Sequence, residues 1–340
     1  MQIIVTIESF DSELAQFDFL IPYLKNTMEN VIKQLIELEK PYINIENLVA
    51  VHFTENYREE LFAFQKSIGH STFATKNKIG EGYAQVVATE IGYHIFFNKL
   101  IPTVIIIGQF LENNSERIDY DYLNKIKLEK KYFLRLIRHE LAHVEDENNQ
   151  KCWTWFKHAF DGNSLQNILR FDAHRLWEEY YACRRSNFFF DINGISEEIK
   201  NLLSSLDKAE KEICELRWKY NNSQMDLNEF IRLLHEYIRS AFIYCCYFMG
   251  HMDRVADDLI CQIKQVVYPS RFFHYIPDMW NALRSMVKVY PQWDGPEIYD
   301  DLSSIVLHCI ENFEIYPSET EKGVYYSIPP KELTPKKEMH

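Results

Sequence analysis

Residues 132–149 constrain the fold of this chain more than any other segment. Apolar side chains recur there at i, i+4, i+8 and i+11: Phe133, Ile137, Leu141 and Val144. This spacing is typical of one stripe of an α-helix, which has to be buried against other elements. His139 and His143 lie off the stripe and, being four residues apart, share another face of the helix. The segment therefore predicts a packed helix that presents two histidines side by side.

His139, Glu140 and His143 have the spacing H-E-x-x-H. Two imidazoles one helical turn apart can reach the same tetrahedral metal at ~2.0–2.1 Å per nitrogen. Glu140 leans over the same position and can take a proton from an attacking water. We expect one zinc ion per chain, with His139 and His143 as ligands and Glu140 as general base. The alternative is a solvated helix on which these three residues are ordinary surface residues.

A second predicted helix, residues 171–187, contains Glu179 and Ala182 in an E-x-x-A spacing. H-E-x-x-H followed on a later helix by E-x-x-A resembles the gluzincin family of zinc metallopeptidases, with a minigluzincin-like core. The resemblance covers these two helices only. It implies that Glu179 is the third zinc ligand beside His139 and His143, and that Glu140 is the general base.

Two alternatives for the third ligand stay open. Glu178 is adjacent to Glu179 and points ~100° away on a helix, so only one of them can face the metal. His174 on the same helix would give a site of three histidines. The chain also departs from the family at Cys183, where an aspartate often accepts a hydrogen bond from a ligand histidine. We expect another acceptor to serve: Asp172, Glu178 or a backbone carbonyl.

Peptide hydrolysis also needs a donor that stabilises the oxyanion. The sequence offers seven candidates: Tyr180, Tyr181, Arg184, His174, His235, His251 and His274. In gluzincins an edge strand typically pairs with the extended substrate, which is a form of β-augmentation. By that analogy, Tyr83–Thr89 or Tyr93–Asn98 would provide the edge.

The composition limits which classes of partner and which cellular compartment are expected for this chain. The formal net charge is −13 with no long basic run, which argues against nucleic-acid binding. The start of the chain is acidic and lacks the basic stretch of a secretory signal, and no apolar run reaches the ~20 residues of a spanning helix. We expect a cytoplasmic protein without membrane insertion. The seven cysteines are then expected to be reduced thiols.

The expected fold class is α+β, with a small, mostly antiparallel sheet, the zincin active-site helices and an all-helical C-terminal region. Residues 1–190 would form the catalytic region, 191–318 a helical region that walls the cleft, and 319–340 a polar, mobile tail. Helices are expected over residues 12–40 and 57–68. The expected strands are Leu48–Phe53, Ser71–Thr75, Tyr83–Thr89, Tyr93–Asn98 and Thr103–Phe110.

These features together predict a zinc-dependent hydrolase, a protease that cleaves peptide bonds in a protein or peptide substrate. The large helical region suggests a narrow, regulatory or defence-type range of substrates. Three other functions stay open: a zinc-stabilised interaction protein without catalysis, a zinc hydrolase that acts on a non-peptide bond, and a helical binding module in which the motif is accidental and no metal is bound. The sequence leaves the substrate, the cleavage site, the activation mechanism and the oligomeric state undetermined.

Overall fold

The computed structural model describes residues 1–39, 41–71, 76–77, 80–81, 84–114, 120–187, 195–253, 269–321 and 323–329. The chain divides into two compact units. The first consists of Met1–Trp153, Glu178–Lys200 and Cys246–Asp257, and the second of Thr154–Trp177, Asn201–Cys245 and Asp258–His340. This division differs from the three consecutive ranges expected from the sequence, because helices α5, α6 and α7 each contribute residues to both units.

A four-stranded sheet forms the centre of the first unit. Its strand order is β1-β2-β6-β5. The strands are β1 (Gln2–Val5), β2 (Leu48–Thr54), β6 (Gly92–Asn98) and β5 (Ala84–Thr89). The strands expected over Leu48–Phe53 and Tyr93–Asn98 are confirmed, as is the described part of Tyr83–Thr89. Of the strand expected over Ser71–Thr75, only Ser71 is described, and it is not in a strand.

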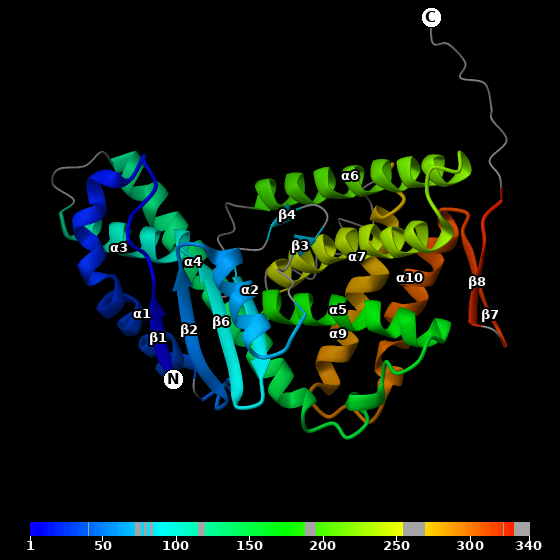
Figure 1. Ribbon diagram of the computed structural model, residues 1–340, viewed down its shortest axis with the longest axis horizontal. Helices are drawn as coiled ribbons and strands as arrows, with labels where there is room; N and C mark the ends of the chain where they lie inside the picture. The colour runs from blue at the N-terminus through cyan, green and yellow to red at the C-terminus, as the bar shows by residue number, and fades with distance from the viewer. Residues whose placement is uncertain are drawn as a thin grey trace, which may run out of the picture. The chain divides into compact units, whose positions relative to one another are not determined.

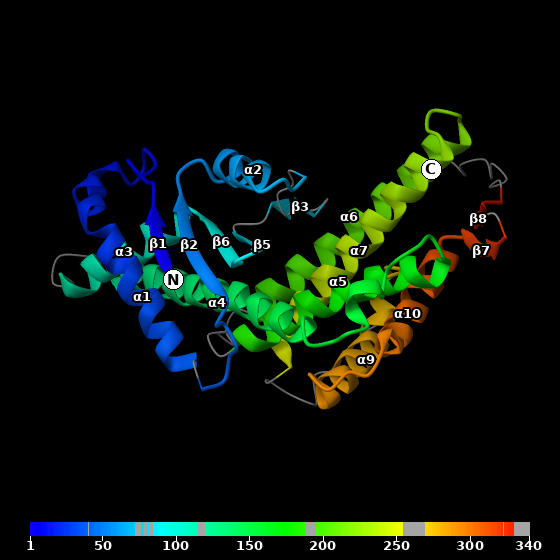
Figure 2. The same ribbon diagram turned by 60° about the horizontal axis from the view of Figure 1, so that its bottom comes forward.

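Helices cover both faces of this sheet (Figures 1 and 2). One face packs into a large core with α1 (Leu24–Glu39), α3 (Leu100–Asn113) and α4 (Tyr120–Gln150), while α2 (Tyr57–Ser67) covers the other face. Side chains alternate along β6 accordingly, since Ile95 and Phe97 lie in the large core and Phe96 lies under α2. The helix expected over 57–68 is confirmed. The helix expected over 12–40 consists of a 3-10 helix, η1 (Ala15–Tyr23), followed by α1, and residue 40 lies outside the described residues.

The α+β class is confirmed, but a mostly antiparallel sheet is not found. β1 pairs with β2 and β2 with β6 in parallel, and only β5 and β6 run antiparallel. The reason is that α1 lies between β1 and β2 along the chain and provides a crossover, whereas β5 and β6 are joined directly by a hairpin. Gly92 closes this hairpin with φ +140°, and a Cβ there would lie 2.2 Å from the Asn47 carbonyl oxygen.

The strand expected over Thr103–Phe110 is wrong, because these residues belong to α3. Every residue from Ile101 to Gly108 is buried, so the apolar run carries no period that separates a strand from a buried helix. The hydroxyl of Thr103 donates to the Lys99 carbonyl 2.8 Å away, a bond one turn back along the helix. Burial on all sides therefore outweighs the β-propensity of its branched side chains.

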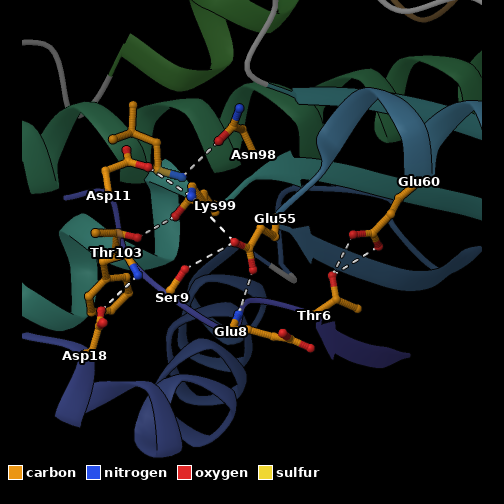
Figure 3. A network of polar contacts seen from close by, with 12 residues as sticks. Thr6, Glu8, Ser9, Asp11, Asp18, Glu55, Glu60, Asn98, Lys99 and Thr103 are labelled. Atoms are coloured by element: carbon orange, nitrogen blue, oxygen red, sulfur yellow. Dashed lines mark hydrogen bonds and ion pairs between the residues drawn. The ribbon is translucent and has the colours of Figure 1, made fainter. Parts of the chain in front are cut away.

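Polar contacts join the ends of β1 and β2 to the start of α3 (Figure 3). Glu55 follows β2, accepts from the Glu8 backbone N–H at 2.9 Å, and lies 3.8 Å from the Lys99 ammonium group. Lys99 also pairs with Asp11 at 2.9 Å, and Thr6 donates to Glu60 on α2 at 2.9 Å. These contacts fix the loops at the carboxyl ends of the parallel strands.

The second unit is helical. Its helices are the first part of α5 (Leu165–Ser186), most of α6 (Ile195–Asn221) and of α7 (Leu227–Met252), α9 (Ile276–Val289) and α10 (Asp300–Asn312). Short 3-10 helices are η3 (Phe156–His158), η6 (Phe273–Tyr275) and η7 (Pro296–Tyr299). The segment expected to be a mobile tail begins inside a hairpin of β7 (Tyr316–Thr320) and β8 (Gly323–Ser327). Its last residues, from 330 on, lie outside the described ones.

Two further short strands, β3 (Lys76–Asn77) and β4 (Gly80–Glu81), pair with each other in the first unit. In the described part of the chain, none of the helices has the length and the apolar character needed to span a bilayer.

Candidate metal centre

Helices α4 and α5 bring three metal-ligating side chains together within the first unit. The Nε2 atoms of His139 and His143 lie 3.1 Å apart, and their rings meet edge to face. The Oε2 atom of Glu179, which α5 contributes, lies 3.4 Å from Nε2 of His139 and 3.8 Å from that of His143. The structure thus places the three ligands expected from the sequence around one point.

These distances suit a tetrahedral zinc ion. Ligand atoms at ~2.0–2.2 Å from zinc at tetrahedral angles are separated from one another by roughly 3.3–3.5 Å. The three measured separations, 3.1, 3.4 and 3.8 Å, bracket that range. Two imidazole nitrogens and one carboxylate are also a donor set that catalytic zinc sites use, with a fourth position left for water or substrate.

Glu140 lies beside this group on the buried side of α4, with 6% of its surface exposed. The pKa of its carboxyl group is raised to about 7, chiefly by burial and also by the charge of the neighbouring Glu179, while His139 acts in the opposite direction. A carboxyl group with a pKa near neutrality can both accept and return a proton. The position predicted for a general base is therefore occupied by a carboxylate of suitable chemistry.

Glu178 faces a different neighbour. Burial of Glu147 is the main reason that the pKa of its carboxyl group is raised to about 7, and the charges of Glu178 and Asp146 contribute to the rise. Glu147 lies one helical turn beyond His143 on α4. Glu178 thus belongs to an acidic group next to the three ligands and is absent from the group that could hold a metal among the described residues. His174 is not in that group either, since it stacks on Phe160 and contacts the Tyr299 hydroxyl in the second unit.

The raised pKa of Glu147 predicts a pH-dependent effect of Glu147→Gln. In the unfolded chain the carboxyl group ionises near pH 4.5 and in the folded protein near pH 7, so its ionisation costs stability as the pH rises between these values. At pH 8 we expect Glu147→Gln to raise the free energy of unfolding by about 1–3 kcal/mol, and at pH 4.5 to change it little. Urea unfolding of both metal-free proteins at the two pH values measures the difference. An equal effect at both would contradict the assignment.

The side chain that faces Nδ1 of His139, the nitrogen directed away from His143 and Glu179, was not predicted. Nδ1 of His139 lies 3.5 Å from the sulfur of Cys183. Neither acidic acceptor expected from the sequence is found there. Asp172 accepts from Arg239 at 2.7 Å and contacts Nδ1 of His235 at 2.7 Å in the second unit, and Glu178 acts on Glu147. The expectation that Asp172 or Glu178 accepts the hydrogen bond of this histidine nitrogen is therefore wrong.

The expected oxyanion donors have partners away from the three ligands. The Tyr180 hydroxyl donates to Asp253 at 3.0 Å, where Arg184 also donates, and the Tyr181 hydroxyl donates to Glu145 at 2.8 Å. His251 lies 3.5 Å from Glu198. The remaining three candidates, His174, His235 and His274, belong to the second unit.

Two tyrosines near the site were missed by the sequence reasoning. Tyr57, the first residue of α2, is buried, and its hydroxyl has no hydrogen-bond partner among the described residues. Burial and the charge of Glu140 raise the pKa of this phenol, which places Tyr57 in the electrostatic field of Glu140. The ring of Tyr247 on α7 lies edge to face with that of His139, with centroids 6.3 Å apart. Both come from segments distant from the H-E-x-x-H motif, and no local pattern marks them.

The structure also separates the two candidates for an edge strand. β6 lies between β2 and β5, so the proposal that Tyr93–Asn98 forms an edge is wrong. β5 is one of the two outer strands of the described sheet, with β1 at the other edge, and it packs against α4, the helix that carries both histidines.

Ion pairs, one buried and one partly buried, anchor the two helices of the site. Arg138, next to His139, donates to Glu39 at the end of α1 at 2.8 Å. Arg185 on α5 donates to both carboxylate oxygens of Glu145 on α4, at 2.9 and 3.1 Å. Two parallel bonds of this kind fix the mutual orientation of the groups. They hold α4 and α5 in the register that brings Glu179 to the histidines.

No protein-family model matches this chain, and neither a curated protein nor a solved structure does.

Proposed function

We propose that this protein is a zinc-dependent hydrolase of peptide bonds with a gluzincin-type active site. The observation that carries the proposal is the convergence of His139, His143 and Glu179, with Glu140 buried beside them. Bound zinc supplies Lewis-acid polarisation of the scissile carbonyl and makes the attacking water more acidic. The Glu140 carboxylate accepts the proton of this water and delivers it to the leaving amine.

Strand β5 provides the surface on which an extended peptide would lie. Its outer side has no strand partner within the described sheet, and α4 packs against it. Main-chain hydrogen bonds to such an edge align a peptide without reading its sequence. This arrangement favours a peptide as substrate over a small ester or nucleotide. A narrow, regulatory or defence-type range of protein substrates remains part of the proposal.

The proposal is tested on the wild-type protein by two measurements. Elemental analysis after reconstitution should give about one zinc per chain, as expected for three converging ligands. A peptide library should then be cleaved, and a zinc chelator should stop the cleavage. Zinc without cleavage, together with unfolding when the metal is removed, would instead indicate a zinc-stabilised interaction protein. Cleavage of non-peptide esters or amides alone would indicate the other hydrolase class.

Tyr57 is the hydroxyl that we propose as oxyanion donor, because it is buried, feels the charge of Glu140 and has no partner in the described part of the chain. We expect Tyr57→Phe to lower kcat by about 10²-fold, the loss typical of one oxyanion donor, with little change in zinc content. Stability should hold or rise, since the substitution removes a buried hydroxyl that makes no hydrogen bond.

The matched control is Tyr180→Phe, which removes a hydroxyl that donates to Asp253. It should leave kcat near the wild-type value while lowering stability. If Tyr57→Phe keeps full activity, the oxyanion donor is another group, and Tyr247 is the next to test because its ring contacts that of His139.

A further inference from the structure

The imidazole of His139 is held from both sides. Its Nε2 faces His143 at 3.1 Å and Glu179 at 3.4 Å, while its Nδ1 lies 3.5 Å from the Cys183 sulfur. A histidine binds a metal through the nitrogen that carries no proton, so the proton must reside on the other nitrogen. An acceptor at Nδ1 therefore decides whether Nε2 is ready to bind. Cys183 occupies that position, and 2% of its surface is exposed.

Cys183 is placed by an unusually close crossing of α5 and α7. A Cβ on Gly250 of α7 would lie 2.6 Å from Cβ of Cys183 and 2.8 Å from the Tyr180 carbonyl oxygen. Only glycine fits at such a separation. The crossing brings the next residue, His251, into hydrogen-bond contact with Cys183. The sulfur thus lies between two imidazoles from different helices.

The contacts continue beyond His251. Its Nδ1 lies 3.5 Å from Oε1 of Glu198 on α6, and this oxygen accepts from Arg135 on α4 at 3.5 Å. Four helices of the first unit therefore contribute to one continuous row of side chains: His139, Cys183, His251, Glu198 and Arg135. None of the last four residues has a role in the proposed hydrolysis.

We propose that Cys183 is the positioning residue of His139: its sulfur accepts the Nδ1–H bond and so directs Nε2 to the metal, while His251 and Glu198 hold the sulfur in place. The inference deepens the proposed function and rests on it. Metal-bound histidines generally donate their second N–H to such an acceptor, and loss of the acceptor typically weakens metal binding ~10–100-fold. Here a thiol group fills a position where a carboxylate is usual, which makes the acceptor weaker.

Zinc affinity, measured by competition with a chromophoric chelator, tests the positioning role. Cys183→Ala should weaken zinc binding ~10–100-fold, and Cys183→Asp, which restores an acceptor, should recover most of the loss. His251→Gln should weaken binding less than Cys183→Ala does, because His251 acts through the sulfur. The matched control is Cys214→Ala, an exposed cysteine of the second unit, which should bind zinc as the wild type does. Unchanged affinity in Cys183→Ala would overturn the proposal.

A second readout needs no metal. With ¹⁵N-labelled histidine, the Nδ1 proton of His139 should give a resonance protected from exchange in the metal-free wild type and in Cys183→Asp. This resonance should disappear in Cys183→Ala, and its persistence there would overturn the proposed contact. If no variant binds zinc but the resonance still disappears in Cys183→Ala, the proposed function is refuted, while the hydrogen bond between Cys183 and His139 is established.

Discussion

Glu179→Ala is expected to abolish stoichiometric zinc binding. The substitution removes the only carboxylate of the three converging ligands and leaves two imidazoles. Two ligands hold zinc far more weakly than three, so the loss of affinity should exceed the ~10–100-fold that accompanies removal of a supporting acceptor. Elemental analysis after dialysis against a buffer of low free zinc measures the outcome.

The neighbouring Glu178 gives a closely matched control. Both residues are buried glutamates on α5, and their side chains leave the helix in directions ~100° apart. Glu178→Ala should retain about one zinc per chain, because its side chain acts on Glu147. Retention of zinc in Glu179→Ala together with its loss in Glu178→Ala would reverse the assignment of the third ligand.

Glu140→Gln is expected to retain zinc and to lose peptide hydrolysis by a factor of about 10² or more. Glutamine has nearly the same shape as glutamate but cannot accept the proton of the attacking water, so the substitution removes the base. Glu140 is also not one of the three converging ligands, which is why metal content should hold. Zinc content, kcat and the circular dichroism spectrum, measured together, separate a loss of chemistry from a loss of metal or fold.

Full activity in Glu140→Gln would remove Glu140 from the mechanism and would favour a non-catalytic role for the metal. A contrasting variant is Glu145→Gln on the same helix. Glu145 accepts from Tyr181 and Arg185 and helps to hold α4 against α5, so this variant should lose stability, and zinc with it, rather than lose chemistry alone.

The helices that carry the site could be predicted from the sequence with little ambiguity. The stripe of Phe133, Ile137, Leu141 and Val144 predicts α4, and all four side chains are buried in the large core as expected. The strand expected over Thr103–Phe110 is wrong because the same kind of one-sided stripe is missing there. Its residues from Thr103 to Gly108 are all buried, so this part of the pattern has no exposed face from which a period could be read.

Strand direction in the sheet could not be predicted from periodicity. An alternating pattern along β2 or β6 is the same whether the neighbouring strand runs parallel or antiparallel. The direction follows from the connections, and α1 between β1 and β2 makes that pair parallel. The same limit applies to the edge of the sheet, because only the strand order shows that β5 is outermost.

The sequence by itself determined one half of the candidate site. His139, Glu140 and His143 are related by the geometry of a single helix, which local hydrogen bonds fix whatever the helix packs against. The tertiary structure decided the other half: that Glu179 rather than Glu178 faces the histidines, that Cys183 meets Nδ1 of His139, and that Tyr57 is buried where the charge of Glu140 acts on it. These relations join segments far apart in the chain, and they exist only because close packing at positions such as Gly250 sets how α4, α5 and α7 meet.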